Sequence, residues 1–275
     1  MNIYKQLEIA LQSADVEVKE GLTAECLRAV KEDIYEGVGD FEPEVFALPS
    51  YASFCEIVLP KHLKTRKDFD TSEGLATLVH SIAHIEFSAI DLALDAVYRY
   101  PLMSRAYKQD WLEVASDELR HFKMLNTLLE DLGFKYGDFP VHCGLFDASH
   151  NTRKSLLDRM AVVPRYFEAS GLDVGPMIIK KLENKHKIPA VSRLIEMLEL
   201  ISEEEVDHVL KGDKWFKILC KEKGIKDGEE EIEYFAILER YDLLDKHRPH
   251  LNVKARKASG FSCVEIKKLG AKECD

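Results

Sequence analysis

Two Glu-x-x-His pairs are the residues of this sequence whose types and spacing are suited to chemistry. Glu118 and His121 form the first pair, and Glu205 and His208 form the second. Residues three apart lie on the same face of an α-helix, so each pair can present a carboxylate and an imidazole together. Both groups are ligands of iron and manganese ions. The pairs therefore indicate metal binding, provided that helices bring them into one core.

A lone glutamate precedes each pair at a similar distance. Glu86 lies 32 residues before Glu118, and Glu168 lies 37 residues before Glu205. On a helical wheel the neighbours of Glu86 are all apolar, and the faces of the other three glutamates are largely apolar. Unpaired buried charge is unfavourable, so glutamates on such faces need a cation. The repeated order of Glu and then Glu-x-x-His predicts two helical hairpins that each contribute one such set.

The predicted set is chemically suited to a pair of divalent ions. Four glutamates carry about −4 of charge, which balances two such ions, and two neutral imidazoles complete the ligand shell. Without metal the carboxylates would repel one another in a low dielectric. We therefore expect the metal-free protein to be less stable and to release protons as it takes up metal. The spacing suits two iron ions and equally a pair that contains manganese.

Helical periodicity dominates the chain and predicts an all-α fold. Asp70, three residues before Glu73, is expected to start the first long helix, and Pro101 to lie early in the second. The third long helix is expected to bend near Pro164 and to end at Gly171. Four principal helices are predicted over about residues 71–99, 101–132, 152–172 and 190–211.

Shorter elements are expected on either side of these helices. Residues 1–70 are predicted to form an N-terminal helical extension, 71–211 the four-helix bundle with the metal site, and 212–275 a C-terminal helical extension with a basic tail. Irregular stretches are expected at 38–70 and 133–150. The shorter predicted helices span about residues 2–14, 22–36, 174–187, 215–223, 229–244 and 252–270.

The charge distribution limits the classes of partner. A formal net charge of −11 speaks against general nucleic-acid binding. Residues 246–272, however, hold eight Lys or Arg residues against one Glu. This basic tail is either a solvated segment that packs on an acidic body or a grip for an anionic substrate, with RNA as the extreme case.

Cysteine usage and hydropathy indicate a cytoplasmic protein without a membrane partner. The six cysteines include no C-x-x-C pair, which argues against a disulfide framework, a zinc ribbon and a rubredoxin-type iron site. No apolar run approaches the roughly 18–20 residues of a membrane span, and the first residues do not read as a signal peptide. Neither a G-x-G-x-x-G nor a phosphate-binding G-x-x-x-x-G-K motif is present, so no nucleotide cofactor is expected.

Two further residues are candidates for support of the metal ligands. His84 is either a proton relay or an ordinary packing residue, on a face shared with His80 and Asp91. Arg165, one turn before Glu168, is either the partner of a ligating carboxylate or a surface residue. No catalytic residue beyond the metal ligands is expected.

Four motifs resemble the ferritin-like di-iron carboxylate superfamily. They are HxxxHxE from His80 to Glu86, ELRHF, EASGLD and EEVDHV, and they lie within residues 71–211. The C-terminal segment RPHLNVKARKASGF is similar to that of one bacterial branch of this superfamily, and the tRNA hydroxylases of isopentenyl-adenosine derivatives are more distantly similar in architecture. The resemblance implies six ligand positions, at Glu86, Glu118, His121, Glu168, Glu205 and His208.

The resemblance implies a di-iron, or iron–manganese, oxidoreductase that activates O2 to hydroxylate or oxidise an organic substrate. Electrons would come from an external donor, because the C-x-x-C electron-transfer domain of rubrerythrins is missing, and a homodimer is expected. The chain is also longer than ferritin-cage subunits, which argues against simple storage. Three alternatives stay open: a ferroxidase or iron-binding protein without an organic substrate, a dimanganese peroxide-disproportionating enzyme, and a metal-free interaction scaffold.

Overall fold

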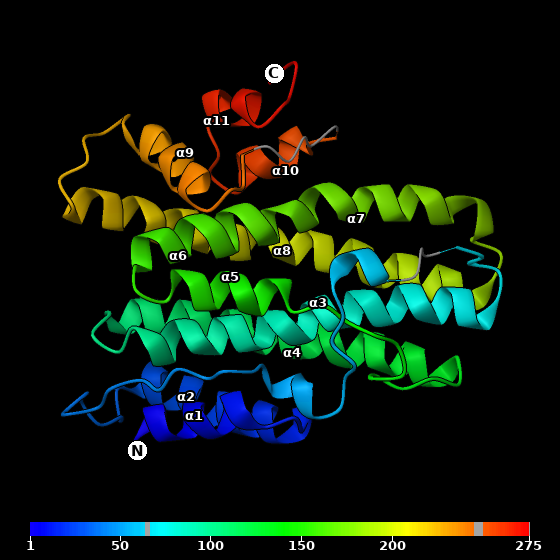
Figure 1. Ribbon diagram of the computed structural model, residues 1–275, viewed down its shortest axis with the longest axis horizontal. Coiled ribbons are helices and arrows are strands. Elements are labelled where there is room, and N and C mark those ends of the chain that lie inside the picture. Colours follow the sequence, from blue (N-terminus) through cyan, green and yellow to red (C-terminus); the bar gives the residue numbers. More distant parts are fainter. Residues whose placement is uncertain (64–66, 245–249, 275) are drawn as a thin grey trace. The chain divides into compact units, whose positions relative to one another are not determined.

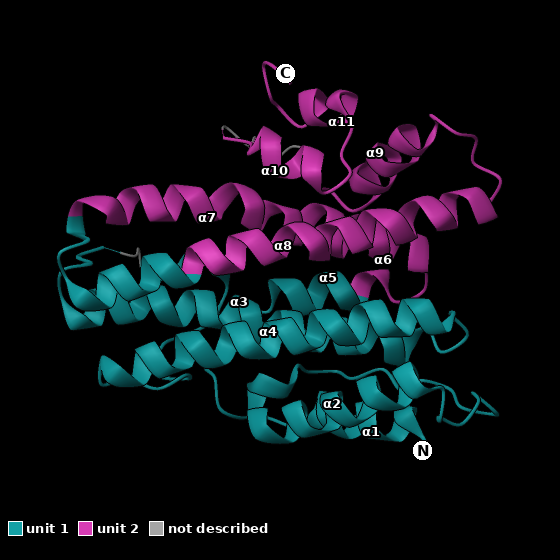
Figure 2. Cartoon of the chain, turned by 180° about the vertical axis from the view of Figure 1, so that it is seen from behind, with its two compact units in different colours: residues 1–150, 185–197 teal, residues 151–184, 198–275 magenta. Residues whose placement is uncertain are grey.

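The computed structural model describes residues 1–275 except 64–66, 245–249 and 275. The predicted all-α fold is confirmed: within these described ranges no strand occurs, and Ile57 and Val141 form an isolated parallel bridge. Contacts divide the chain into two compact units, shown in Figure 2. Unit 1 comprises residues 1–150 and 185–197, and unit 2 comprises residues 151–184 and 198–275.

Unit 1 is built on two long helices that pack against each other, α3 (Ser72–Arg99) and α4 (Arg105–Asp131). The shorter helices α1 (Ile3–Gln12) and α2 (Val16–Glu32) form a hairpin that covers them (Figure 1). Helix α1 contacts α3, and α2 contacts α4. The hairpin covers the face of α3 that carries Asp91 and the face of α4 that carries Lys123.

Side-chain caps decide where the two long helices begin. Helix α3 begins after Thr71, whose hydroxyl accepts a hydrogen bond from the amide of Gly74, so the cap is Thr71 rather than the predicted Asp70. Helix α4 begins after Ser104, whose hydroxyl caps it in the same way. Pro101 lies in a turn before this helix instead of within its first turn.

A buried ion pair ties the covering hairpin to α3. The Lys19 side chain is fully buried and donates hydrogen bonds to the Ala10 carbonyl at 2.7 Å and to Asp91 at 2.5 Å. Asp91 also accepts a hydrogen bond from Ser50 at 2.6 Å, in the short 3-10 turn Ser50–Ser53. Asp91 therefore anchors two peripheral segments on the helix that carries Glu86.

Unit 2 contains one long helical run with an irregular centre. Helix α6 (Leu156–Val162) leads into the π-helical turn η3 (Val163–Glu168), which continues as α7 (Ala169–Leu182). The predicted bend near Pro164 is thus a π-helical turn. The predicted end at Gly171 is wrong, because the helix continues through this residue.

Helix α8 (Pro189–Glu222) joins two helices that the sequence predicted separately. Its residues 198–222 belong to unit 2. Gly212 allows α8 to approach η3 closely, because a Cβ atom at this position would collide with the Pro164 ring. The close approach holds the π-helical turn against the helix that carries the second Glu-x-x-His pair.

Three short helices complete unit 2. Helix α9 (Glu230–Arg240) contacts α6, and α10 (Val253–Ala258) contacts α7 and α11 (Cys263–Lys268). The predicted single helix over 252–270 is broken at Gly260, whose positive φ of 96° favours glycine. Residues 246–249 of the predicted basic tail lie outside the described residues.

Three further features differ from the sequence predictions. Cys263 and Cys274 form a disulfide, while Cys26, Cys55, Cys143 and Cys220 are free. A short helix, α5 (Gly144–Thr152), begins within the predicted connection 133–150. By length and composition α3 could cross a membrane, but 72% of its most apolar window is buried within the structure, as in the core helix of a soluble protein.

Candidate metal centre

Two carboxylates and an imidazole meet in unit 1. Glu86 lies at the middle of α3, and Glu118 and His121 project from α4. Each offers one ligand atom, and these atoms lie within 4.8 Å of one another. His121 Nδ1 is 3.2 Å from Glu86 Oε2 and 3.6 Å from Glu118 Oε2. All three side chains are buried, with Glu86 the most exposed at 5%. This cluster of glutamate and histidine could hold a metal ion.

The electrostatics of the cluster favour a cation. Burial lowers the pKa of His121, but hydrogen bonds and charges from Glu118 and Glu86 outweigh it and raise this pKa to about 11. In the metal-free protein the imidazole therefore holds a proton between the two carboxylates. A divalent ion would bring more positive charge to the same place, and carboxylate with neutral imidazole is the ligand chemistry of iron and manganese.

The second Glu-x-x-His pair has similar geometry within unit 2. His208 Nδ1 is 3.6 Å from Glu205 Oε1, the same separation as in the pair on α4. His208 is fully buried and Glu205 is 9% exposed. Helix α8 therefore presents the pair in the manner that three-residue spacing on one helical face predicts.

Glu168, one of the predicted ligands, lies in a backbone conformation that the sequence did not predict. It is the last residue of the π-helical turn η3 and is half-buried. Turns of this type are rare and occur frequently at functional sites. Glu168 thus shares unit 2 with the pair on α8, just as Glu86 shares unit 1 with the pair on α4. Each unit contributes one lone glutamate and one Glu-x-x-His pair, and the assembly of both sets into a single centre stays a prediction.

The two predicted supporting residues have definite partners. Arg165 is fully buried and forms ion pairs with Asp213 at 3.0 Å and with Glu265 at 2.7 Å. His84 Nε2 lies 2.7 Å from the carbonyl oxygen of His142 and therefore donates a hydrogen bond to it. These partners are far away in the sequence, and no periodicity within one helix could have revealed them. A supporting role of either residue toward the metal ligands stays a prediction.

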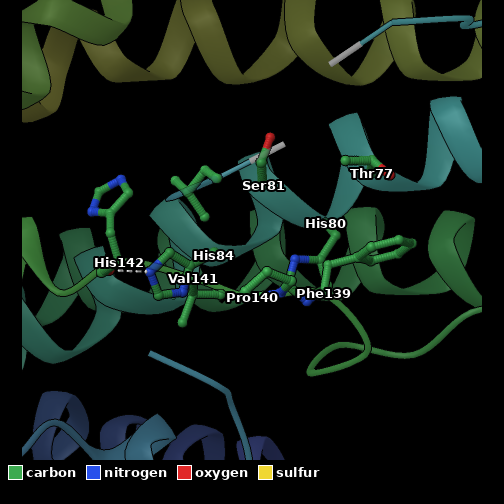
Figure 3. Close-up of a pocket in the computed structure, with 9 residues that line it drawn as sticks. Thr77, His80, Ser81, His84, Phe139, Pro140, Val141 and His142 are labelled. Atoms are coloured by element: carbon green, nitrogen blue, oxygen red, sulfur yellow. Dashed lines mark hydrogen bonds between the residues drawn. The ribbon is translucent and has the colours of Figure 1, made fainter. Parts of the chain in front are cut away.

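A small pocket opens beside His84, two residues before Glu86 on α3, and Glu86 does not line it (Figure 3). Because the Nε2 atom of His84 carries the hydrogen, its Nδ1 accepts the hydrogen bond of the Tyr136 hydroxyl at 2.8 Å. Burial lowers the pKa of His80 and of His84 to about 4. Both imidazoles are therefore neutral at pH 7. The pocket is lined by Leu63, Thr77, His80, Ser81, His84, Phe139, Pro140, Val141 and His142.

Acid is expected to destabilise the protein through His80. Burial lowers the pKa of this imidazole from 6.5 to about 4, and its Nε2 accepts a hydrogen bond from the Gly137 amide that protonation would break. Between about pH 4 and pH 6.5, His80 is therefore more protonated in the unfolded chain than in the folded one. Stability is therefore complete above pH 6.5 and falls by up to about 3 kcal/mol as the pH approaches 4.

Urea unfolding at pH 7 and pH 4.5 measures this effect. We expect His80→Gln to lose less stability than the wild type between these pH values, whereas a variant of the exposed His62, His62→Gln, should behave as the wild type does. Equal losses in all three proteins would show that His80 does not contribute to the acid sensitivity.

Similarity to known proteins extends over nearly the whole chain. No solved structure matches it. A protein of Haemophilus influenzae, whose name reads only "uncharacterized protein", is 34% identical over 287 positions, which cover 96% of this chain and 92% of that protein. A family model matches residues 12–267, a range that includes all six predicted ligands. The chain therefore belongs to the family described as "protein of unknown function (DUF455)".

Proposed function

We propose that the chain is an O2-dependent oxidoreductase of the ferritin-like di-iron type, which hydroxylates or oxidises an organic substrate. The observation that carries the proposal is the buried cluster of Glu86, Glu118 and His121, whose ligand atoms lie within 4.8 Å of one another. Two buried carboxylates carry more negative charge than one protonated imidazole balances, which favours a further cation in the cluster. A site of this kind is more readily explained by a ligand than by packing.

The equivalent residues of unit 2 support a centre with two metal ions. Glu168, Glu205 and His208 repeat the residue types of the cluster in unit 1, and the two Glu-x-x-His pairs share their internal spacing. A glutamate from each of two helices and a Glu-x-x-His pair from each of two others is the ligand set of ferritin-like di-metal proteins. When bound, iron ions supply the electron transfer to O2 that the side chains themselves cannot perform. Manganese is the alternative metal.

The residues around the cluster would keep water away from the ligands. Ala83 and Ile90 neighbour Glu86 along one face of α3, and Val114 and Leu125 neighbour the pair on α4; all four are fully buried. In the low-dielectric environment that these side chains create, the attraction between a cation and the carboxylates is stronger than in water. The apolar surroundings also suit an organic substrate better than a cargo of hydrated ions.

Further elements of the proposal concern partners and location. An external protein or small molecule is proposed as the electron donor, and a homodimer as the assembly. The cytoplasm is the proposed compartment because four of the six cysteines are free thiols. The basic tail is proposed to bind an anionic substrate, RNA included.

Metal reconstitution tests the proposal. Anaerobic titration with Fe(II) is expected to show two ions per chain, with affinity that falls as the pH is lowered, because carboxylates and imidazoles bind metal only when deprotonated. Subsequent O2 consumption should match the oxidation of these two ions. Many iron atoms per chain would instead indicate storage, and rapid loss of hydrogen peroxide with a manganese-loaded protein would indicate the peroxide-disproportionating alternative. A chain that binds neither metal stoichiometrically would refute the proposal.

A further inference from the structure

An unusual backbone conformation determines the direction in which the Glu168 side chain projects from its helix. The turn η3 is π-helical, whereas α6 before it and α7 after it are α-helical. Pro164 has no amide hydrogen, and in an α-helix its ring would clash with the carbonyl four residues earlier. A π-turn holds about one extra residue, so its loss would turn Glu168 by roughly 100° about the helix axis relative to α6.

Charged and aromatic side chains pack around Arg165, a buried residue of this turn. Arg165 lies within η3 and pairs with Asp213 of α8 at 3.0 Å and with Glu265 of α11 at 2.7 Å. Lys217 also pairs with Asp213, at 2.7 Å, so two carboxylates meet two cations in this network. Three aromatic rings surround the guanidinium carbon, at 4.6 Å for Phe216, 4.3 Å for Tyr234 and 4.8 Å for Phe261. Such contacts between a cation and ring faces are favourable, particularly when desolvated.

The backbone on both sides of Glu168 is held by side chains from outside its own helix. The Tyr234 hydroxyl donates to the carbonyl oxygen of Arg165 at 3.1 Å. Arg256 donates from Nη2 to the carbonyl oxygen of Ala169, the residue after Glu168, also at 3.1 Å. Widened turns leave carbonyl groups without their α-helical partners, and donors of this kind replace them.

Arg256 is itself held rigidly. Its Nε and Nη2 atoms form a fork on the Asp173 carboxylate of α7, with a shortest distance of 2.6 Å, and its side chain is fully buried. The backbone amide of Asn252 donates to the same carboxylate at 2.8 Å. Bidentate pairs between arginine and carboxylate are among the strongest and most directional hydrogen-bonded contacts.

One ring joins the two arginine clusters. Phe261 lies 4.8 Å from the guanidinium carbon of Arg165 and 5.0 Å from that of Arg256. It is 4% exposed and occupies the bend between α10 and α11. The C-terminal segment therefore contacts the helix on either side of Glu168, and every contact described lies within unit 2.

We infer that Arg165, Tyr234 and Arg256 are positioning residues that maintain the π-helical turn and so set the direction of the Glu168 carboxylate as a metal ligand. The inference rests on the proposed function, because it concerns one of the proposed ligands. It assigns a role to the C-terminal segment, which supplies Arg256 and Phe261 without itself supplying a ligand.

Tyr234→Phe is the sharpest test, because it removes the hydroxyl that holds the Arg165 carbonyl and keeps the ring over the guanidinium. Co(II) titration followed by visible absorption is the measurement, since the spectrum reports ligand geometry as well as affinity. We expect Co(II) affinity to fall by about ten- to a hundredfold, as for other residues that orient metal ligands. We also expect the absorption bands of the bound ion to shift.

Tyr241→Phe is the matched control. It removes another phenol hydroxyl of unit 2, which donates to Asp158 on α6 at 3.0 Å and not to the turn. This control should bind Co(II) within about twofold of the wild type, with an unchanged spectrum. Should Tyr234→Phe fail to fold, Phe261→Leu provides the second variant, because it removes the ring shared by both arginines and keeps apolar volume.

The outcomes separate the inference from the proposed function. A wild-type chain that binds no Co(II) would overturn both. If Glu168→Ala weakens binding but Tyr234→Phe matches its control in affinity and spectrum, the ligand is real and the positioning role is wrong. If Tyr234→Phe shifts the spectrum and weakens binding while Tyr241→Phe does neither, the positioning role is supported by a signal that a general loss of stability would not give.

Discussion

Glu118→Gln is expected to abolish the stabilisation that metal gives the protein. At a free metal concentration of 100 times Kd, a ligand that binds only the folded state stabilises it by about 2.7 kcal/mol. For a chain of this size the gain corresponds to a rise in Tm of roughly 5–11 °C. Glu118 is fully buried and lies 3.6 Å from His121 Nδ1, so an amide here removes a central charge of the cluster. Metal affinity should fall more than a hundredfold, beyond the range for residues that only orient ligands.

Thermal unfolding with and without Fe(II) under anaerobic conditions measures this effect. Glu130→Gln is the control, because Glu130 lies on the same helix but is exposed. This variant should keep the full rise in Tm on addition of metal. A rise of equal size in Glu118→Gln would exclude Glu118 as a ligand, whatever the metal content of the wild type.

Arg256→Met is expected to cause the largest loss of stability. The substitution keeps apolar volume but leaves the Asp173 carboxylate buried without the guanidinium that forks onto it. Removal of one partner from a buried ion pair costs about 3–5 kcal/mol. The corresponding decrease in Tm is about 6–20 °C.

A second substitution separates loss of the pair from loss of packing. When both charges of a buried pair are replaced by apolar residues, most of the stability commonly returns. The double variant Arg256→Met with Asp173→Leu should therefore be more stable than Arg256→Met alone in urea unfolding. Lys257→Met, at an exposed neighbouring position, should change stability little. A double variant less stable than the single one would contradict this account, because it would show that the Asp173 carboxylate stabilises the fold even without Arg256.

The parts of the site that sequence could predict are those that depend on one helix at a time. Glu118 and His121 lie together because residues three apart share a helical face, and the apolar neighbours of Glu86 indicated its burial correctly. The all-α fold followed from the same periodicity. Helix limits were less accurate: the caps are Thr71 and Ser104, one and three residues beyond Asp70 and Pro101, and local sequence alone does not decide between neighbouring cap candidates.

The features that sequence did not predict depend on contacts between distant segments. Arg165 meets Glu265 across 100 residues, and Arg256 meets Asp173 across 83. Nothing in local spacing distinguishes such an arginine from a solvated one. The π-helical turn was anticipated only as a bend, because Pro164 indicates that an α-helical bond is missing but not how the backbone replaces it.

The long apolar helix α3 has a consequence for partitioning into a membrane. Its length and composition resemble those of a bilayer-spanning segment, yet Glu86 lies at its midpoint and Asp91 five residues further on. An ionised side chain at the centre of such a segment opposes insertion by about 3 kcal/mol. The carboxylate proposed to hold metal would therefore also oppose partitioning of this helix into lipid.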